Sequence, residues 1–157
     1  MNHSPKVNEI IANFKGNATS ETDFELSTYK GKSNLIIYFY PKDSTPGCTK
    51  EGNEFTEHYS EFQKHDTEIF GVSKDSMKRH ENFKAKQGFP FELISDESGE
   101  ICEHFNVWQL KKNYGKEYMG IVRSTFLIDK SGALRAHWDK VRVKGHVEEV
   151  LEAVKKL

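Results

Sequence analysis

The sequence has little cysteine, no long hydrophobic run and almost no net charge. Only Cys48 and Cys102 are cysteines among 157 residues, which argues against a secreted scaffold held by disulfides and favours a reducing cytoplasm. No stretch approaches the ~20 apolar residues of a membrane-spanning helix, and residues 1–15 do not resemble a signal peptide. With 23 basic and 24 acidic side chains the net charge is −1, so neither a nucleic acid nor a membrane is expected as a partner.

The composition is typical of a globular protein with a single domain. Hydrophobic residues make up 36% of the chain and charged residues 30%. A chain of this length usually forms one domain, and no repeat, low-complexity run or linker interrupts it. We therefore expect one domain over residues 1–157. The seven histidines show no ligand spacing with the cysteines, so no metal site is expected.

The hydrophobic pattern predicts alternating strands and helices. The expected strands are residues 34–40, 68–73, 91–94, 119–128 and 133–138, and the expected helices run from about 46 past 62, from 76 to about 86, over 100–105 and over 147–157. A strand–helix–strand unit makes parallel neighbours, and a hairpin turning at residues 129–132 adds antiparallel ones. We expect an α/β protein with a mixed central β-sheet flanked by helices. This is the element order of the thioredoxin-like fold, whose chemistry lies after the first strand, here at residues 41–51.

That connection places a cysteine in the first turn of a helix. Thr45 suits the N-cap and Pro46 the first helical position, so Cys48 would be the third helical residue. Backbone N–H groups there lack intrahelical partners and favour an anion. Helix N-termini and nearby cations lower a thiol pKa from about 8.5 to about 3.5–7.5, so this position favours a nucleophilic thiolate. The alternative is a buried, inert cysteine. A dithiol motif is excluded, because Thr45 and Glu51 occupy the positions three residues to either side.

Several motifs resemble the peroxiredoxin family. Residues 41–48 match the signature P-x-x-x-T-x-x-C, and the string YFYPKDSTPGCTKE is similar to the bacterioferritin comigratory protein, or peroxiredoxin Q, subfamily. The likeness covers about residues 20–157 and continues at residues 89–96, 123–126 and 145–151. It implies a thioredoxin-like thiol peroxidase that reduces hydrogen peroxide and organic hydroperoxides, an antioxidant of cell redox homeostasis in the cytoplasm.

The resemblance also implies roles for four residues. Cys48 would attack the hydroperoxide and become a sulfenic acid, a reaction that needs no cofactor. Thr45 would hydrogen-bond the peroxide or the sulfur, with capping alone as the alternative, and Pro41 would shield the thiolate, with strand termination as the alternative. Arg123 would bind the sulfur and the reacting oxygens through its planar guanidinium. Because it interrupts an apolar strand, a structural salt bridge is its alternative.

The chain departs from the subfamily at the second cysteine. Many members carry a resolving cysteine five positions after the first, where this chain has Asn53, and others carry it on the next helix, where none occurs. Cys102 shares a predicted helix face with Ile101 and Phe105 and is expected to be buried. We therefore expect a one-cysteine peroxidase, a monomer or weak dimer, reduced by thioredoxin or by glutaredoxin with glutathione. The alternatives are an atypical two-cysteine peroxidase using Cys102 and a redox sensor without turnover.

Overall fold

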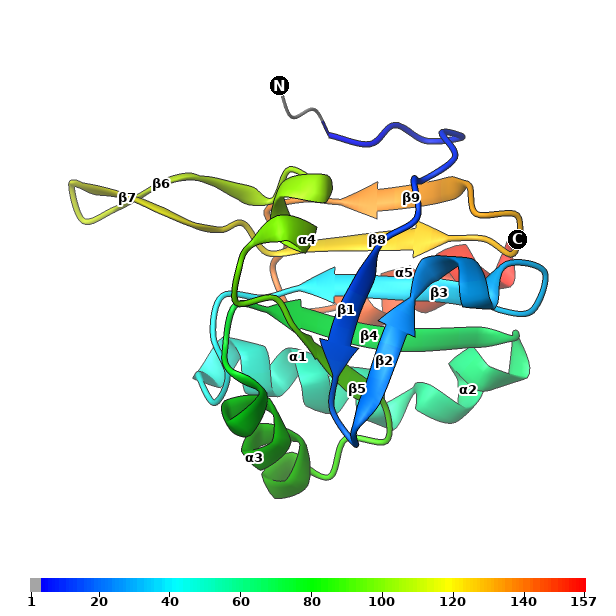
Figure 1. Ribbon diagram of the computed structural model, residues 1–157, viewed down its shortest axis with the longest axis horizontal. Helices are drawn as coiled ribbons and strands as arrows, with labels where there is room; N and C mark the ends of the chain where they lie inside the picture. The colour runs from blue at the N-terminus through cyan, green and yellow to red at the C-terminus, as the bar shows by residue number, and fades with distance from the viewer. Residues whose placement is uncertain (1–3) are drawn as a thin grey trace.

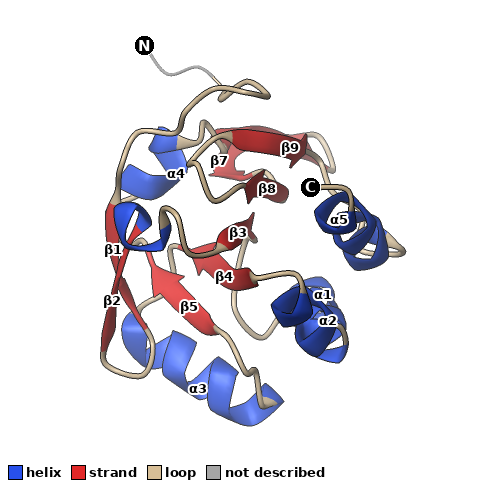
Figure 2. Ribbon diagram, turned by 90° about the vertical axis from the view of Figure 1, so that its right-hand side faces the viewer, coloured by secondary structure: helices blue, strands red, loops and turns tan. Residues whose placement is uncertain are grey.

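The computed structural model describes residues 4–157 and places a seven-stranded sheet between two layers (Figures 1 and 2). The strands are β1 (Lys15–Ala18), β2 (Thr22–Glu25), β3 (Asn34–Phe39), β4 (Thr67–Ser73), β5 (Glu92–Ser95), β6 (Trp108–Asn113), β7 (Lys116–Ile121), β8 (Ser124–Ile128) and β9 (Leu134–Trp138). The helices are α1 (Pro46–Glu57), α2 (Tyr59–Lys64), α3 (Met77–Gln87), α4 (Glu100–His104) and α5 (His146–Lys155), with a 3-10 helix at Leu26–Tyr29. Residues 1–3 lie outside the described residues. They begin the expected domain and the segment that does not resemble a signal peptide.

The main sheet is mixed, as the sequence predicts. Its order is β2-β1-β5-β4-β3-β8-β9, with β3 parallel to β4 and antiparallel to β8. All six residues of β3 are buried, because the strand lies inside the sheet and both of its faces are covered. In the described part of the chain, no helix has the length and apolar character needed to cross a membrane.

Successive side chains of β3 enter two different cores. Ile37 and Phe39 point into a core closed by α4 and the β1–β2 hairpin, whereas Ile36 and Tyr38 point into a core covered by α1, α2, α3 and α5 (Figure 2). Cys48 packs in the helix-covered core. Cys102 packs in the other core, so the sheet separates the two thiols.

Two expected elements are divided in the structure. The helix after Thr45 breaks at His58 into α1 and α2, although Phe55 and Phe62, seven positions apart, are both buried. The prediction of one strand over residues 119–128 is wrong, because the chain leaves β7 at Ile121 and enters β8 at Ser124. Arg123 therefore does not lie within a central strand. Since Ser124 pairs with Phe39 at the end of β3, the break sets the Arg123 charge at the end of the sheet rather than between buried strands.

The sequence analysis missed two hairpins, β1–β2 and β6–β7. The β6–β7 pair forms a separate two-stranded sheet that extends away from the main body (Figure 1). Most of its residues are exposed and polar, so the alternation that marks a half-buried strand is weak. Its tight turn uses Tyr114 and Gly115, both with positive φ.

Candidate active site

The N-terminus of α1 presents Cys48 as the sequence predicts. The helix begins at Pro46 with Thr45 in an extended N-cap conformation, so Cys48 is the third helical residue. The helical hydrogen bonds begin with the Thr49 N–H donating to the Thr45 carbonyl, so the N–H groups of Gly47 and Cys48 precede them. These two N–H groups and the helix dipole favour negative charge at the sulfur.

The side chain of Thr45 does not cap the helix. Its hydroxyl donates instead to the Lys42 carbonyl at 2.8 Å, a contact within the loop that leads to α1. This hydrogen bond fixes the hydroxyl orientation and leaves the oxygen able to accept a further hydrogen bond. Pro41 is exposed at the start of the same loop, directly after Tyr40, whose N–H makes a hydrogen bond to Val72 at the end of β4. The structure thus places Thr45 and Pro41 at the two ends of the short loop before Cys48.

Arg123 joins the cysteine to a buried carboxylate. Its Nη2 donates to Cys48 Sγ at 3.3 Å, and its Nη1 donates to Glu51 Oε1 at 2.6 Å. The sulfur contact and the salt bridge, which the sequence posed as alternatives for Arg123, are therefore both present. Gly47 leaves room for this arrangement, because a Cβ at that position would lie 3.3 Å from Nη2. The cation faces two groups that become anionic, so it can stabilise a thiolate at Cys48.

Glu51 is a site residue that the sequence analysis missed. It is fully buried on the face of α1 that also buries Cys48, Gly52 and Phe55, and a glutamate within such a stripe is the signal that could have found it. Its Oε2 has no hydrogen-bond partner among the described residues. Burial raises the pKa of Glu51 to about 7, against the opposing effect of Arg123. The carboxyl group is thus close to its titration point at neutral pH.

Cys102 has a different environment, in which a carboxylate rather than a guanidinium is the charged neighbour. Its side chain is completely buried in α4, and its N–H donates to Asp96 Oδ2 at 2.8 Å. Burial, with the Asp96 charge adding to it, raises the pKa of Cys102 well above that of an ordinary thiol. The prediction that Cys102 is a buried apolar residue is confirmed, and its thiol is disfavoured as a nucleophile.

Comparisons with known proteins show the family to which the chain belongs. A family model described as the AhpC/TSA family matches residues 7–137. The chain is 53% identical over 131 residues to peroxiredoxin Bcp of Bacillus subtilis, covering 83% of each protein. It resembles a solved structure of Xanthomonas campestris peroxiredoxin Q with a TM-score of 0.89 and 44% identity, over 97% of this chain and 96% of that one. A structure of the Xanthomonas campestris bacterioferritin comigratory protein, solved to study alkyl peroxide reduction, gives a TM-score of 0.88 at 43% identity, with coverage of 97% and 96%. These likenesses confirm the thioredoxin-like fold.

The buried Glu51 predicts a pH dependence of stability. Its pKa is about 7 in the folded chain against 4.5 ordinarily, so its protonation stabilises the fold, fully below pH 4.5, and this stability is lost as the pH rises through 7. Glu51→Gln removes the titration while keeping an oxygen for Arg123. Urea unfolding of both proteins between about pH 4.5 and 8 should show wild type losing on the order of 1–3 kcal/mol relative to the variant.

The control for this experiment is Glu57→Gln, which alters an exposed glutamate of the same helix. It should leave the pH dependence of wild type unchanged. If Glu51→Gln also follows the wild-type pH profile, burial does not govern the ionisation of this carboxyl group.

Proposed function

Since the chain belongs to the AhpC/TSA family and is a peroxiredoxin, a thiol peroxidase, we propose that Cys48 is the thiol that attacks the hydroperoxide. One observation carries this proposal: Cys48 Sγ lies in the first turn of α1 and accepts a hydrogen bond from Arg123 Nη2 at 3.3 Å. A cysteine in an electropositive setting at a helix N-terminus has the surroundings of a reactive thiolate. Cys102 lacks them, because its charged neighbour is the Asp96 carboxylate and its pKa is raised.

The proposed reaction transfers one oxygen atom from the hydroperoxide to sulfur. The Cys48 thiolate attacks the terminal oxygen, the S–O bond forms, the O–O bond breaks, and the alkoxide or hydroxide that leaves takes up a proton from solvent. The sulfur loses two electrons and becomes a sulfenic acid, while the hydroperoxide is reduced to an alcohol or water. Negative charge moves from sulfur to the leaving oxygen. Arg123 and the N–H groups that begin α1 are positioned to stabilise this charge throughout the step.

Thr45 and Pro41 have supporting roles in this proposal. The Thr45 hydroxyl is bonded to the Lys42 carbonyl, so its oxygen is oriented to accept the hydrogen bond of the terminal hydroperoxide O–H. That contact would align the O–O bond with the attacking sulfur. Pro41 offers no N–H donor and would limit the access of water to the thiolate.

We further propose that the substrates are hydrogen peroxide and organic hydroperoxides. The Xanthomonas campestris neighbour studied for alkyl peroxide reduction supports the second class. No cofactor enters the reaction, and the electrons come from an external thiol, thioredoxin or glutaredoxin with glutathione. The protein would act in the cytoplasm as a monomer or weak dimer. The separation of Cys48 and Cys102 by the sheet supports a one-cysteine mechanism.

Replacing Cys48 tests the proposed function directly. Cys48→Ser should abolish hydroperoxide reduction with a thiol reductant, because serine is a far weaker nucleophile at neutral pH. Stopped-flow consumption of peroxide measures the loss, and circular dichroism shows that the fold is retained. A variant that keeps more than about a tenth of the wild-type rate would contradict the assignment, since removing a nucleophile usually costs several orders of magnitude.

The guanidinium of Arg123 should be required in addition to its charge. Arg123→Lys keeps the charge but cannot bridge Cys48 and Glu51 with a planar fork, so we expect a fall of about tenfold or more in the second-order rate with peroxide. Arg135→Lys, at an exposed position on β9, is the matched control and should react like wild type. Wild-type reactivity in Arg123→Met would rule out this role.

A one-cysteine mechanism predicts that Cys102 is dispensable for turnover. Cys102→Ser should leave the thiol-dependent steady-state rate nearly unchanged, and peroxide in modest excess should over-oxidise Cys48 to the sulfinic acid, seen by intact mass. Two results would contradict this prediction. One is a Cys48–Cys102 disulfide found by peptide mapping, and the other is a severalfold lower steady-state rate in Cys102→Ser. Together they would establish an atypical two-cysteine peroxidase.

A further inference from the structure

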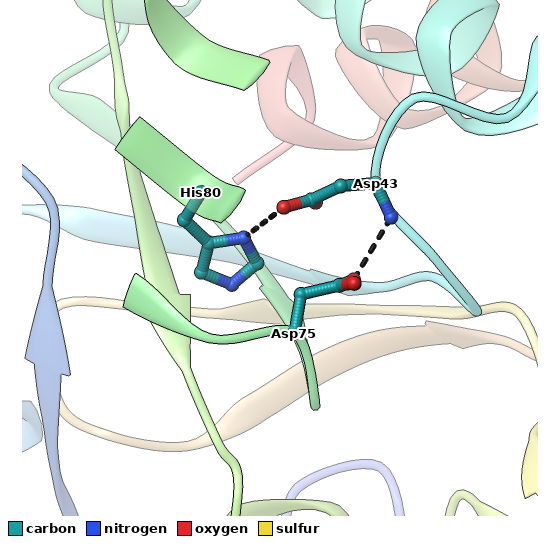
Figure 3. A group of neighbouring side chains, drawn as sticks. All are labelled: Asp43, Asp75 and His80. Carbon is teal, nitrogen blue, oxygen red and sulfur yellow. Dashed lines mark hydrogen bonds and ion pairs between the residues drawn. The ribbon is translucent and has the colours of Figure 1, made fainter. Parts of the chain in front are cut away.

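The loop that precedes Cys48 contains a buried carboxylate. Pro41, Lys42 and Ser44 are exposed, yet Asp43 between them is only 2% exposed. Its side chain points toward α3, where it meets His80, which is completely buried, and its backbone faces Asp75 (Figure 3). A buried carboxylate is costly unless it is fully hydrogen-bonded, so its partners indicate what it does.

Every polar atom of Asp43 that faces this cluster has a partner. Oδ1 accepts from the Tyr40 hydroxyl at 2.5 Å, and Oδ2 lies 2.6 Å from His80 Nδ1. The Asp43 N–H donates to Asp75 Oδ2 at 2.8 Å, and Asp75 Oδ2 also accepts from the Ser73 hydroxyl. Arg79 Nε pairs with the other Asp75 oxygen.

The geometry assigns a shared proton to the Asp43–His80 pair. His80 Nε2 lies 2.9 Å from the Ile94 carbonyl, which can only accept, so Nε2 carries a hydrogen. Nδ1 then meets Asp43 either as the second N–H of an imidazolium or as the acceptor from a protonated carboxyl group. Because Asp43 Oδ2 and His80 Nδ1 bond each other directly, a proton rather than a metal ion fills the space between them.

We propose that Asp43 and His80 are positioning residues for peroxide reduction, an inference that rests on the proposed role of Cys48. The loop connects the end of β3 to the N-cap of α1, and its Ser44 has a left-handed φ of 64°, a strained conformation for a residue other than glycine. Such a loop keeps one conformation only where its surroundings hold it. Asp43 supplies that anchor. It stands between Ser44 and Lys42, and the Lys42 carbonyl orients the Thr45 hydroxyl.

The role of the pair is therefore to hold the groups around the peroxide rather than to activate the sulfur. The sulfur contacts Arg123 and the start of α1, neither of which touches His80 in the hydrogen bonds described above. Loosening the loop should displace Thr45 and Pro41 while leaving the thiolate and its cation in place. Reaction with hydroperoxide needs that alignment, whereas simple alkylation of the thiolate does not.

Two substitutions at His80 separate its two hydrogen bonds. The amide nitrogen of asparagine can occupy the position of Nδ1, so His80→Asn keeps a donor for Asp43. The amide nitrogen of glutamine can occupy the position of Nε2, so His80→Gln keeps the Ile94 bond and loses the Asp43 bond. We expect His80→Gln to lower the second-order rate with peroxide by about tenfold or more, and His80→Asn to restore most of it. The rate of Cys48 alkylation by iodoacetamide should fall by no more than about threefold in both, because a looser loop does not restrict access to the sulfur.

A matched control is His104→Gln, because His104 lies on another helix and its Nε2 also bonds a backbone carbonyl, that of Ala12 at 3.0 Å. It should match wild type in both reactions. If His80→Gln fails to fold, Tyr40→Phe serves instead, since it removes the hydroxyl from Asp43 Oδ1 and keeps the buried ring. The same selective loss of the peroxide rate is expected.

The inference is overturned if the variant lacking the Asp43 bond reacts with peroxide at the wild-type rate, if His80→Asn is as slow as His80→Gln, or if alkylation falls in parallel with peroxide reduction. Wild type and Cys48→Ser are measured in the same assays, so that failure of the positioning role can be told apart from failure of the proposed function. If the Cys48→Ser variant reduces peroxide as wild type does, the proposed role of Cys48 itself is refuted.

Discussion

The guanidinium of Arg123 lies between a sulfur and a carboxylate, and the organisation of the site depends on that placement. The Arg123 side chain is largely buried, at 16% exposed, and Glu51 compensates its charge through the 2.6 Å contact when the carboxyl group is ionised. Ionisation of Cys48 then adds a second negative charge beside one positive charge. With Glu51 protonated the cation and the thiolate balance, whereas with Glu51 ionised one negative charge is in excess. The raised pKa of Glu51, near 7, therefore links the charge balance at the sulfur to pH through a residue that does not take part in the bond exchange.

The fold brings these groups together from distant parts of the chain. The end of β3 and the start of β8 are neighbours, because Phe39 pairs with Ser124, and the loop to α1 starts beside the residue that precedes β8. The sheet thus fixes the end of β3, which leads to α1, and the start of β8, which follows Arg123. Arg123 therefore reaches the first turn of α1. Asp43 connects the site to β4 and α3 in the same way. It bonds Asp75, which lies between β4 and α3, and His80, which lies on α3. The chemistry is located at one end of the sheet, where three connections converge.

The sequence predicted those parts of the site that depend on local chemistry. Thr45 and Pro46 define the beginning of a helix wherever they occur in such a context, so the position of Cys48 could be inferred from its neighbours. The helix expected from residue 76 to about 86 is likewise present as α3, and its buried residues His80 and Phe83 lie three positions apart on one face. The pairing of His80 with Asp43, which are 37 positions apart, could not be read from a pattern, because tertiary packing alone determines it. The break at residues 122–123 was missed for a related reason: residues 119–128 are apolar enough to read as one strand, and the interrupting Arg123 alone does not show that the chain passes from one sheet to another.

The same geometry bears on how the oxidised enzyme is reduced. In the subfamily that the sequence resembles, many members carry a second cysteine five positions after the first, and others carry it on the following helix. Here these places lie side by side, because Asn53 of α1 hydrogen-bonds Gln87 at the end of α3 at 3.3 Å. Both routes would therefore use one exposed surface near Cys48, and in this chain that surface is polar and lacks a thiol. Cys102 offers no equivalent route, since it lies in the core on the other side of the sheet and reaching Cys48 would require α4 to leave that core. Exposing that core costs apolar burial at about 25 cal/mol per Å², whereas an incoming thiol needs only access to the loop before α1. This difference in cost supports the proposed reduction of Cys48 by an external thiol.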